Sequence, residues 1–266
     1  MCAKQKGAIK LKGLLGNLMF YQKNGKSFVQ EVSFPSKSKI QNAPSFKRRR
    51  ENMMEFGGCS MAAKAFRMGL GELSKFMGGA YISARLTARF KQVNMQGSGE
   101  RGKRSIELLV NKGILEEYDF NPDTTFGSVF SAPFDIMANI DRNVVTVTIP
   151  VFNTNAFVSP PLKSTHFRIV NAAVVLSDYT YDPAMRLYKP VNPLINKLNS
   201  ITYSDYTVLG NNISGIMTIV SAIPGSPVIP TTAGVIACLG IEFYQEINGD
   251  YYQLAAKNAM RLERVF

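Results

Sequence analysis

The chain has 266 residues, of which 45% are hydrophobic, so it can fill one large core or two ordinary ones and is not a disordered chain. Its three cysteines, Cys2, Cys59 and Cys238, are widely separated and form no CxxC pair. Their number and spacing exclude a disulfide framework and a zinc site, and they favour a reducing compartment.

The N-terminus, MCAKQKGAIKLKG, contains lysines but no apolar stretch after them, so it does not have the pattern of a secretory signal. No segment approaches the roughly 20 apolar residues of a membrane helix. The most apolar stretches, Ile213–Ile223 and Val235–Ile241, are short and interrupted by glycine, and we expect them to be buried strands. The sequence therefore predicts a cytoplasmic protein that does not bind a membrane.

The net charge of +12 is unevenly distributed along the chain. Residues Met1–Lys112 contain 22 Lys and Arg against 6 Asp and Glu, a net charge of +16, whereas Gly113–Phe266 contain 9 against 13, a net charge of −4. A localised positive field attracts polyanions or an acidic protein surface before any specific contact forms. The charge pattern therefore points to a partner for the N-terminal part.

The segment Leu18–Val32 has two strand-like runs on either side of Asn24-Gly25. This dipeptide adopts the positive φ angles of a tight turn, so the segment predicts a β-hairpin. The segment Phe34–Gln41, with Pro35 and alternating Ser and Lys, is too polar for a core and predicts an exposed connection. Asn42-Ala43-Pro44 then predicts the start of a helix, since Asn can cap free backbone amides and Pro is preset to a helical φ.

The first helix is expected to run to Phe56 and to end at Gly57-Gly58. A second amphipathic stretch follows, with Ala62, Phe66, Leu70, Leu73 and Met77 at helical spacing. Gly78-Gly79 is expected to interrupt the chain again before a third helix, whose apolar face holds Ile82, Leu86, Phe90 and Val93.

From about Ile114 the pattern changes to short β-branched or aromatic runs separated by turn residues. The clearest predicted strands are Val144–Ile149, Phe167–Leu176, Gly215–Ala222, Val235–Ile247 and Tyr251–Leu254. Short strands at this spacing are typical of an antiparallel sandwich or barrel. The expected fold is therefore α+β: a basic hairpin and helical region over residues 1–112, then a β-rich, sandwich-like domain over residues 113–266.

Four segments carry a resemblance to a known family. They are the opening AKQKG-x-IKLKG followed by Phe20-Tyr21, the run Arg50-Glu51-Asn52 with Glu55-Phe56-Gly57, the segment Ser164–Phe167, and the closing Gly240–Gly249. Together they resemble a family of uncharacterised proteins common in Bacteroidota. That family has no assigned activity, so the resemblance implies no functional residues; the cluster Lys47–Arg50 is more basic than its pattern.

The segment Gly97–Ser105 matches both GxGxxG and GxxxxGK, patterns whose backbone amides and lysine cradle phosphates. A phosphate loop follows a hydrophobic strand, however, and Ala84–Met95 is helix-like. Arg104 also stands where the Ser or Thr that binds magnesium should be. We therefore interpret the segment as a flexible basic loop between helices.

The other candidates for chemistry lack partners. His166 is the single histidine, and its neighbours Ser164 and Thr165 cannot form a relay with it in one strand. Cys59 and Cys238 lie among small or apolar residues, as unreactive packed thiols do. Glu116, Glu117, Asp119 and Asp123 lack the spacing of a calcium loop, and a solvated strand face explains Glu242 and Glu246. The sequence thus predicts no enzyme, no metal site and no cofactor.

The basic residues form the strongest constellation. A polyanion-binding set is predicted at Lys47, Arg48, Arg49, Arg50, Arg85, Arg89, Arg101, Lys103 and Arg104, with Phe46, Phe66, Tyr81 and Phe90 interleaved. Arginines with stacking aromatic rings can hold a phosphate backbone. The alternative is that the aromatic rings face the helical core and the charges only solubilise the surface.

The leading hypothesis is a non-enzymatic structural or assembly protein. Its basic N-terminal arm would contact neighbouring subunits of a homo-oligomer or a polyanion, and the opposite charges of the two parts would favour contact between copies. A second hypothesis is a sequence-independent nucleic-acid-binding protein, although no recognisable binding motif is present. A third is a hydrolase or nucleotide enzyme that uses His166 or the Gly97–Lys103 loop.

Overall fold

The computed structural model describes residues 2–266, with side chains from Ala3 onward. The chain separates into two compact units, Met1–Arg50 and Glu51–Phe266. The sequence pattern placed a boundary at residues 112 and 113 instead. The physical reason for the difference is that the amphipathic helices after Glu51 bury their apolar faces against the β-rich part, in one shared core.

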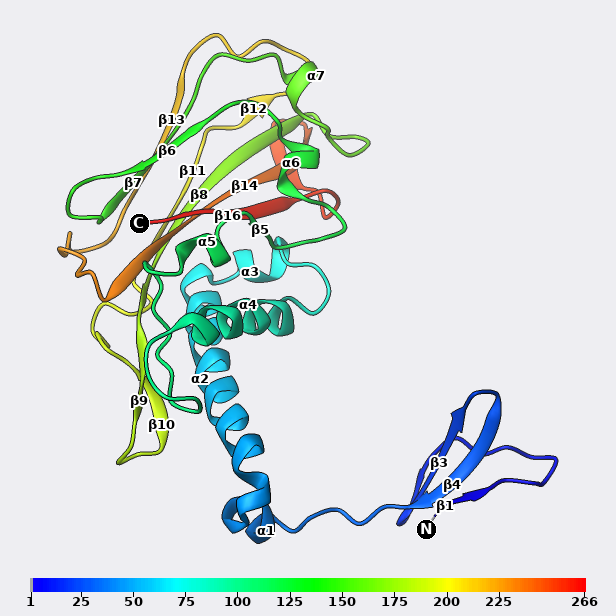
Figure 1. Cartoon of the computed structure of the whole chain (residues 1–266). Helices are drawn as coiled ribbons and strands as arrows, with labels where there is room; N and C mark the ends of the chain where they lie inside the picture. Colours follow the sequence, from blue (N-terminus) through cyan, green and yellow to red (C-terminus); the bar gives the residue numbers. More distant parts are fainter. Residues whose placement is uncertain (1) are drawn as a thin grey trace. The chain divides into compact units, whose positions relative to one another are not determined.

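The first unit contains a four-stranded antiparallel sheet, drawn in blue in Figure 1, with the order β1-β4-β3-β2. Its strands are β1 (Cys2–Lys4), β2 (Gly13–Leu15), β3 (Leu18–Lys23) and β4 (Lys26–Glu31). The turn between β3 and β4 has φ values of 52° at Asn24 and 71° at Gly25, as a type I′ turn requires. The predicted hairpin is confirmed, and two short strands flank it.

The connection after the sheet is exposed, as expected, but it is partly helical. Helix α1 (Lys37–Asn42) is capped by Ser36, whose hydroxyl accepts a hydrogen bond from the Lys39 amide at 3.2 Å. A 3-10 turn, η1 (Pro44–Phe46), follows. The expectation that Asn42 caps this start is wrong, because Asn42 is the last residue of α1 and no side chain caps η1.

Helix α2 (Lys47–Leu70) runs without interruption through Gly57-Gly58, so the predicted break there is wrong. Gly58 is buried, and a Cβ atom at this position would collide with the ring of Tyr188. Gly69 likewise lies against Val174. These glycines let the helix approach the sheet closely instead of ending it. The helix ends at Gly71, where φ is +57°.

The break at Gly78-Gly79 and the apolar faces of the helices are confirmed. Helix α3 (Leu73–Phe76) precedes the break and α4 (Ile82–Gln96) follows it. The expected core residues Ala62, Phe66, Leu70, Leu73, Met77, Leu86, Phe90 and Val93 are all buried. They pack against Val170, Val174 and Ile236 of the sheet in one cluster.

The second unit is built mainly from antiparallel strands, and every strand expected from the sequence is present. Its remaining elements are α5 (Lys112–Leu115), β5 (Tyr118–Asp119), α6 (Phe126–Val129), β6 (Asp135–Ala138), β7 (Val144–Ile149), α7 (Thr154–Phe157), β8 (His166–Ser177), β9 (Tyr179–Asp182), β10 (Leu187–Pro190), β11 (Asn199–Tyr203), β12 (Thr207–Val208), β13 (Met217–Ala222), β14 (Ala233–Ile247), β15 (Asp250–Gln253) and β16 (Ala259–Val265).

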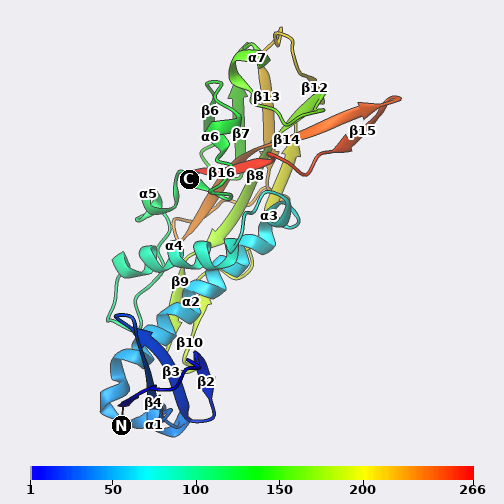
Figure 2. The same cartoon turned by 90° about the vertical axis from the view of Figure 1, so that its right-hand side faces the viewer.

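Two sheets of these strands form a sandwich with helices on one outer face (Figure 1, Figure 2), and β9 and β10 pair as a separate two-stranded sheet. The larger sheet has seven strands, with the path β11-β8-β14-β16-β5 and β12 and β15 at its margins, and the smaller sheet has the order β13-β7-β6. Odd-numbered residues of β8, such as Ile169 and Val175, face the smaller sheet, whereas even-numbered ones, such as Val170 and Val174, face the helices. The predicted α+β fold with a sandwich-like body is confirmed.

Candidate interaction surfaces

The sheet of the first unit has apolar residues on both faces, and no other described element of that unit buries either face. The register places Leu15, Leu18, Phe20 and Val29 on one face, and Leu14, Met19, Tyr21 and Phe28 on the other. No hydrophobic side chain between Ala3 and Arg50 is fully buried. Leu15 is 67% exposed and Met19 47%. A sheet of this kind is stable only when something covers a face.

Within the predicted polyanion-binding set, the cluster Lys47–Arg50 forms the first turn of α2. Lys47, Arg48 and Arg49 are exposed. Arg50 is half-buried, and its guanidinium donates to the carbonyl oxygens of Ile40 and Ala43, each at 2.8 Å. Arg50 therefore fixes the connection before the helix, while the other three residues remain at the surface.

Arg85 and Arg89 share a face of α4, as expected, but both are held by the protein. The Arg85 guanidinium donates to the carbonyl oxygens of Phe120 at 2.8 Å and Asp119 at 2.6 Å. Both guanidinium groups lie over the ring of Tyr118, at 5.2 and 5.7 Å from its centre. These arginines fasten α4 to the segment around β5.

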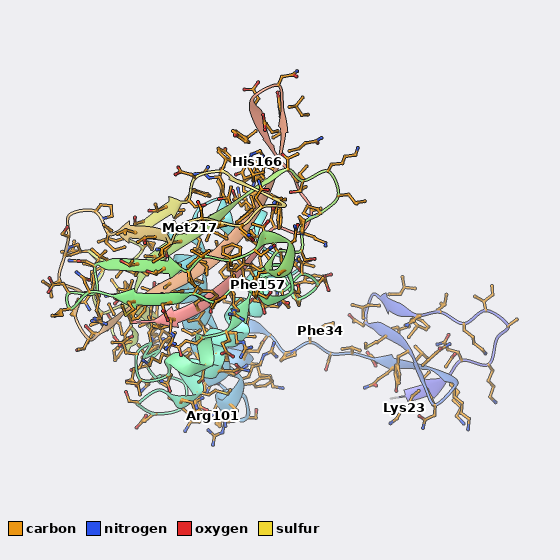
Figure 3. The ribbon with its side chains drawn as sticks, turned by 90° about the horizontal axis from the view of Figure 1, so that it is seen from above. Lys23, Phe34, Arg101, Phe157, His166 and Met217 are labelled. Carbon is orange, nitrogen blue, oxygen red and sulfur yellow. The ribbon has the colours of Figure 1, made fainter. Side chains whose placement is uncertain are left out.

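The glycine loop Gly97–Ser105 is fastened from beneath by the buried carboxylate of Glu55. This carboxylate accepts hydrogen bonds from Lys91, from the Gly102 amide at 2.7 Å, and from Arg104. The Gly102 amide therefore donates to Glu55 and is not free to donate to a phosphate. Lys103 remains exposed. Arg101 is at the edge of the second unit in Figure 3, and its Nε lies 3.6 Å from Oε2 of Glu51.

The interleaved aromatic residues divide between the two interpretations. Phe66 and Phe90 are fully buried and contact each other edge to face in the helix–sheet core. Tyr81 is 84% exposed, and Phe46 is half-buried. Because the rings nearest the arginines of α4 belong to the core, the described residues do not form a stacking platform flanked by free arginines.

His166 begins β8 beside the hairpin of β14 and β15 (Figure 3) and is buried. Its Nδ1 lies 3.0 Å from the Thr165 hydroxyl, and its Nε2 lies 4.0 Å from Oε2 of Glu246. The imidazole ring contacts the Tyr251 ring edge to face. The Thr165 hydroxyl also accepts a hydrogen bond from the Glu246 amide, so Thr165 connects the imidazole to β14.

The thiols of Cys59 and Cys238 are buried. Burial raises the pKa of Cys59 to about 12 and that of Cys238 well above its usual value. Such thiols are protonated at neutral pH and are poor nucleophiles. Among residues 2–266, no group of three or more His, Cys, Asp and Glu side chains is arranged to hold a metal ion.

A polar pocket of about 460 Å³ lies on the second unit between the free edge of β6 and the turn before β5. Glu116, Glu117, Asp135 and Glu263 line it, with Arg264 as the one basic residue. Burial raises the pKa of Glu263, against the ion pair that it forms with Arg261. Clustering of Glu116 with Glu117 was visible in the sequence, but the approach of Asp135 and Glu263 was not.

A second pocket, of about 430 Å³, opens where α2 and α3 cover the end of the larger sheet. Arg168, Glu242, Tyr203 and Tyr244 line it. The expectation that Glu242 lies on a solvated strand face is wrong: Glu242 is 4% exposed, because the helices cover this face. Glu246, further along β14, has a side chain that is 43% exposed, as expected.

Comparison with protein-family models and with curated proteins found no match to this chain. The resemblance to the Bacteroidota family therefore stays a prediction. In the part of the chain that the structure describes, no helix is both long enough and apolar enough to cross a membrane.

Proposed function

We propose that this chain is a structural or assembly protein without enzymatic activity, in which the N-terminal sheet packs against a second copy. The observation that carries the proposal is the sheet of residues 2–31, which presents apolar side chains on both faces and buries none of those described from Ala3 onward. Exposed apolar patches of this kind mark protein–protein contacts. Packing between copies would remove these side chains from water, with the hydrophobic effect as the driving force.

The charge distribution supports contact of the N-terminal unit with another copy of the chain more than it supports contact with a polyanion. Met1–Arg50 contains 12 Lys and Arg against one acidic residue, Glu31, and the rest of the chain contains 19 against 18. The acidic pocket at Glu116, Glu117, Asp135 and Glu263 offers an oppositely charged surface. It adjoins the unpaired edge of β6, and an open sheet edge accepts an added strand through main-chain hydrogen bonds.

Nucleic-acid binding remains the alternative, and the positions of the basic residues weigh against it. Arg50, Arg85 and Arg104 donate to backbone carbonyls or to Glu55, so fewer cations are available to phosphates than the sequence suggests. The exposed residues Lys47, Arg49 and Lys103 are available to either kind of partner.

The test is the mass of the full-length protein in solution, measured by light scattering over a range of concentrations with and without nuclease. We expect a nuclease-resistant oligomer. The double variant Leu15→Ser, Leu18→Ser should dissociate it, because these side chains are neighbours on one uncovered face. The matched control is Leu162→Ser, Leu194→Ser, since these leucines are 94% and 93% exposed on the second unit.

Three outcomes would contradict the proposal. A monomer at every concentration would remove assembly altogether. A mass that falls after nuclease treatment would favour the nucleic-acid alternative. Equal dissociation by the two double variants would show that the N-terminal sheet is not the interface. Thermal unfolding of each variant would establish that the second unit is still folded.

A further inference from the structure

Arg168 on β8 and Glu242 on β14 are directly opposite each other in the larger sheet. Side chains at such positions have Cβ atoms about 4.5–5.5 Å apart, and opposite charges there attract each other. Nevertheless, no ion pair joins Arg168 to Glu242 among the residues that the structure describes. The two charges are held apart, each by its own neighbours.

Arg168 is held by aromatic rings and by one hydrogen bond. Its guanidinium lies 4.5 Å from the ring centre of Tyr203 and 4.7 Å from that of Tyr206. Its Nε donates to the carbonyl oxygen of Ser204 at 2.9 Å. The two terminal nitrogens make no hydrogen bond within the described chain, so the edge of the guanidinium that fits a carboxylate is unused.

Glu242 is 4% exposed. Within residues 3–266, whose side chains the structure describes, one donor serves its carboxylate: the Tyr244 hydroxyl, at 2.6 Å from Oε2. Burial and the neighbouring Glu242 both raise the pKa of Tyr244, so this hydroxyl stays protonated and donates. No cation lies within ion-pair distance of Glu242 in residues 2–266. A buried carboxylate with one donor and no cation is destabilising unless a further partner is supplied.

Both charged groups line the pocket of about 430 Å³ at the end of α2. This volume is within the range of small-molecule sites, roughly 300–1,000 Å³. Apolar side chains of Leu73, Phe76 and Ile201 form another part of the wall. The pocket thus combines one cation, Arg168, with the buried carboxylate of Glu242, the exposed carboxylate of Glu72 and an apolar surface. Helices, strands and the turn between α2 and α3 contribute these groups.

We propose that this pocket binds a small zwitterionic ligand, a free α-amino acid with an apolar side chain. The ligand carboxylate accepts hydrogen bonds from the terminal nitrogens of Arg168, the ligand ammonium pairs with Glu242, and the side chain packs on Leu73, Phe76 and Ile201. A phosphate would be repelled by Glu242, and a simple amine by Arg168. A ligand with both charges avoids each repulsion. This site does not depend on assembly.

The test is calorimetric titration of the full-length protein with three matched probes: L-leucine, L-leucinamide, which lacks the carboxylate, and 4-methylpentanoate, which lacks the ammonium. We expect saturable binding of L-leucine. The affinity of each probe with a single charge should be lower than that of L-leucine by roughly tenfold or more, because the probe loses one charge-assisted interaction. Absence of binding by L-leucine, or equal binding of the three probes, would overturn the proposal.

Two substitutions assign the charges. Arg168→Gln should weaken L-leucine but leave L-leucinamide unchanged, and Glu242→Gln should weaken L-leucine but leave 4-methylpentanoate unchanged. Glu246→Gln is the matched control, on the same strand and outside the pocket. A purely structural role would weaken all probes together, which would overturn the assignment. If either variant fails to unfold cooperatively, the three probes on the unaltered protein decide the question.

Discussion

Glu55 of α2 and Arg104 of the glycine loop form a two-pronged ion pair, in which Nε donates to Oε1 and Nη2 to Oε2, each at 2.8 Å. The carboxylate is almost completely buried, with 2% of its side chain exposed. Burial by itself raises its pKa, but hydrogen bonds from Arg104, Lys91 and the Gly102 amide outweigh burial and lower the pKa to about 2. Glu55 therefore holds the loop as an anion.

Protonation of Glu55 should destabilise the protein in acid. The folded-state pKa of about 2 is below the ordinary value of 4.5, so the stabilisation is fully present above pH 4.5 and is lost as the pH falls toward 2. Glu55→Gln should lower the free energy of unfolding at pH 7 by roughly 3 kcal/mol, because Lys91 and Arg104 lose their anion. Chemical denaturation measured from pH 7 to pH 3 should show the difference between variant and unaltered protein shrinking. A constant difference would contradict this role.

Gly58 and Gly57 should respond in opposite ways to the same substitution. Gly58→Ala places a Cβ against the ring of Tyr188, and that ring is held by its hydroxyl, which donates to the Arg104 carbonyl at 2.9 Å. Overpacking should reduce stability by about 1–3 kcal/mol. A Cβ at Gly57 meets no atom within 4 Å, so Gly57→Ala should increase stability by up to about 1 kcal/mol through helix propensity. Thermal unfolding of both variants measures the contrast, and equal effects would show that packing is not the cause.

This pair of glycines also shows how far the sequence predicts the fold. The Asn24-Gly25 hairpin and the strands follow from local turn chemistry and residue type, and the structure confirms them. The glycines at 57 and 58 have a local preference against helix, which tertiary packing overrides. Gly58 contacts Tyr188, 130 positions along the chain, and no local pattern reports such a contact.

The candidate sites were harder to predict for the same reason. From the sequence, Arg85 is predicted to be an exposed residue that binds a polyanion. In the structure, its hydrogen-bond partners are carbonyl oxygens 34 and 35 positions away. Strand alternation places Glu242 on a defined face but does not say whether helices cover that face. Burial by α2 and α3 turns a surface charge into a pocket charge, and only the packing of distant elements determines that.

Arg85 and Lys103 distinguish basic residues that stabilise the fold from basic residues that are exposed to a partner. Arg85→Ala should destabilise the protein by about 2 kcal/mol, because two backbone carbonyls lose a charged donor. The Lys103 side chain is exposed, so Lys103→Ala should change the free energy of unfolding by less than about 0.5 kcal/mol. Denaturant titration of the two variants measures this difference. Similar, small effects would show that Arg85 is free for an external partner.

The last prediction concerns the tip of the N-terminal hairpin. Lys23 and Lys26 are opposite each other across the Asn24-Gly25 turn, and both are exposed. Like charges at such positions repel each other, and an acidic surface of another copy would relieve the repulsion. If the acidic pocket supplies that surface, assembly should weaken as salt rises, because charges separated by more than about 8 Å are screened at physiological ionic strength.

Charge reversal tests this contact directly in the full-length protein. Lys23→Glu with Lys26→Glu should dissociate the assembly at low salt, whereas the control Lys163→Glu with Lys197→Glu, which makes the same change in net charge at exposed positions of the second unit, should not. Adding Glu117→Lys and Asp135→Lys to the hairpin variant should restore the oligomer, since the two surfaces again carry opposite charges. Light scattering at low and high salt follows all three. Restoration would identify the pocket as the acceptor; dissociation by the control pair to the same extent would show that overall charge, not the hairpin tip, governs assembly.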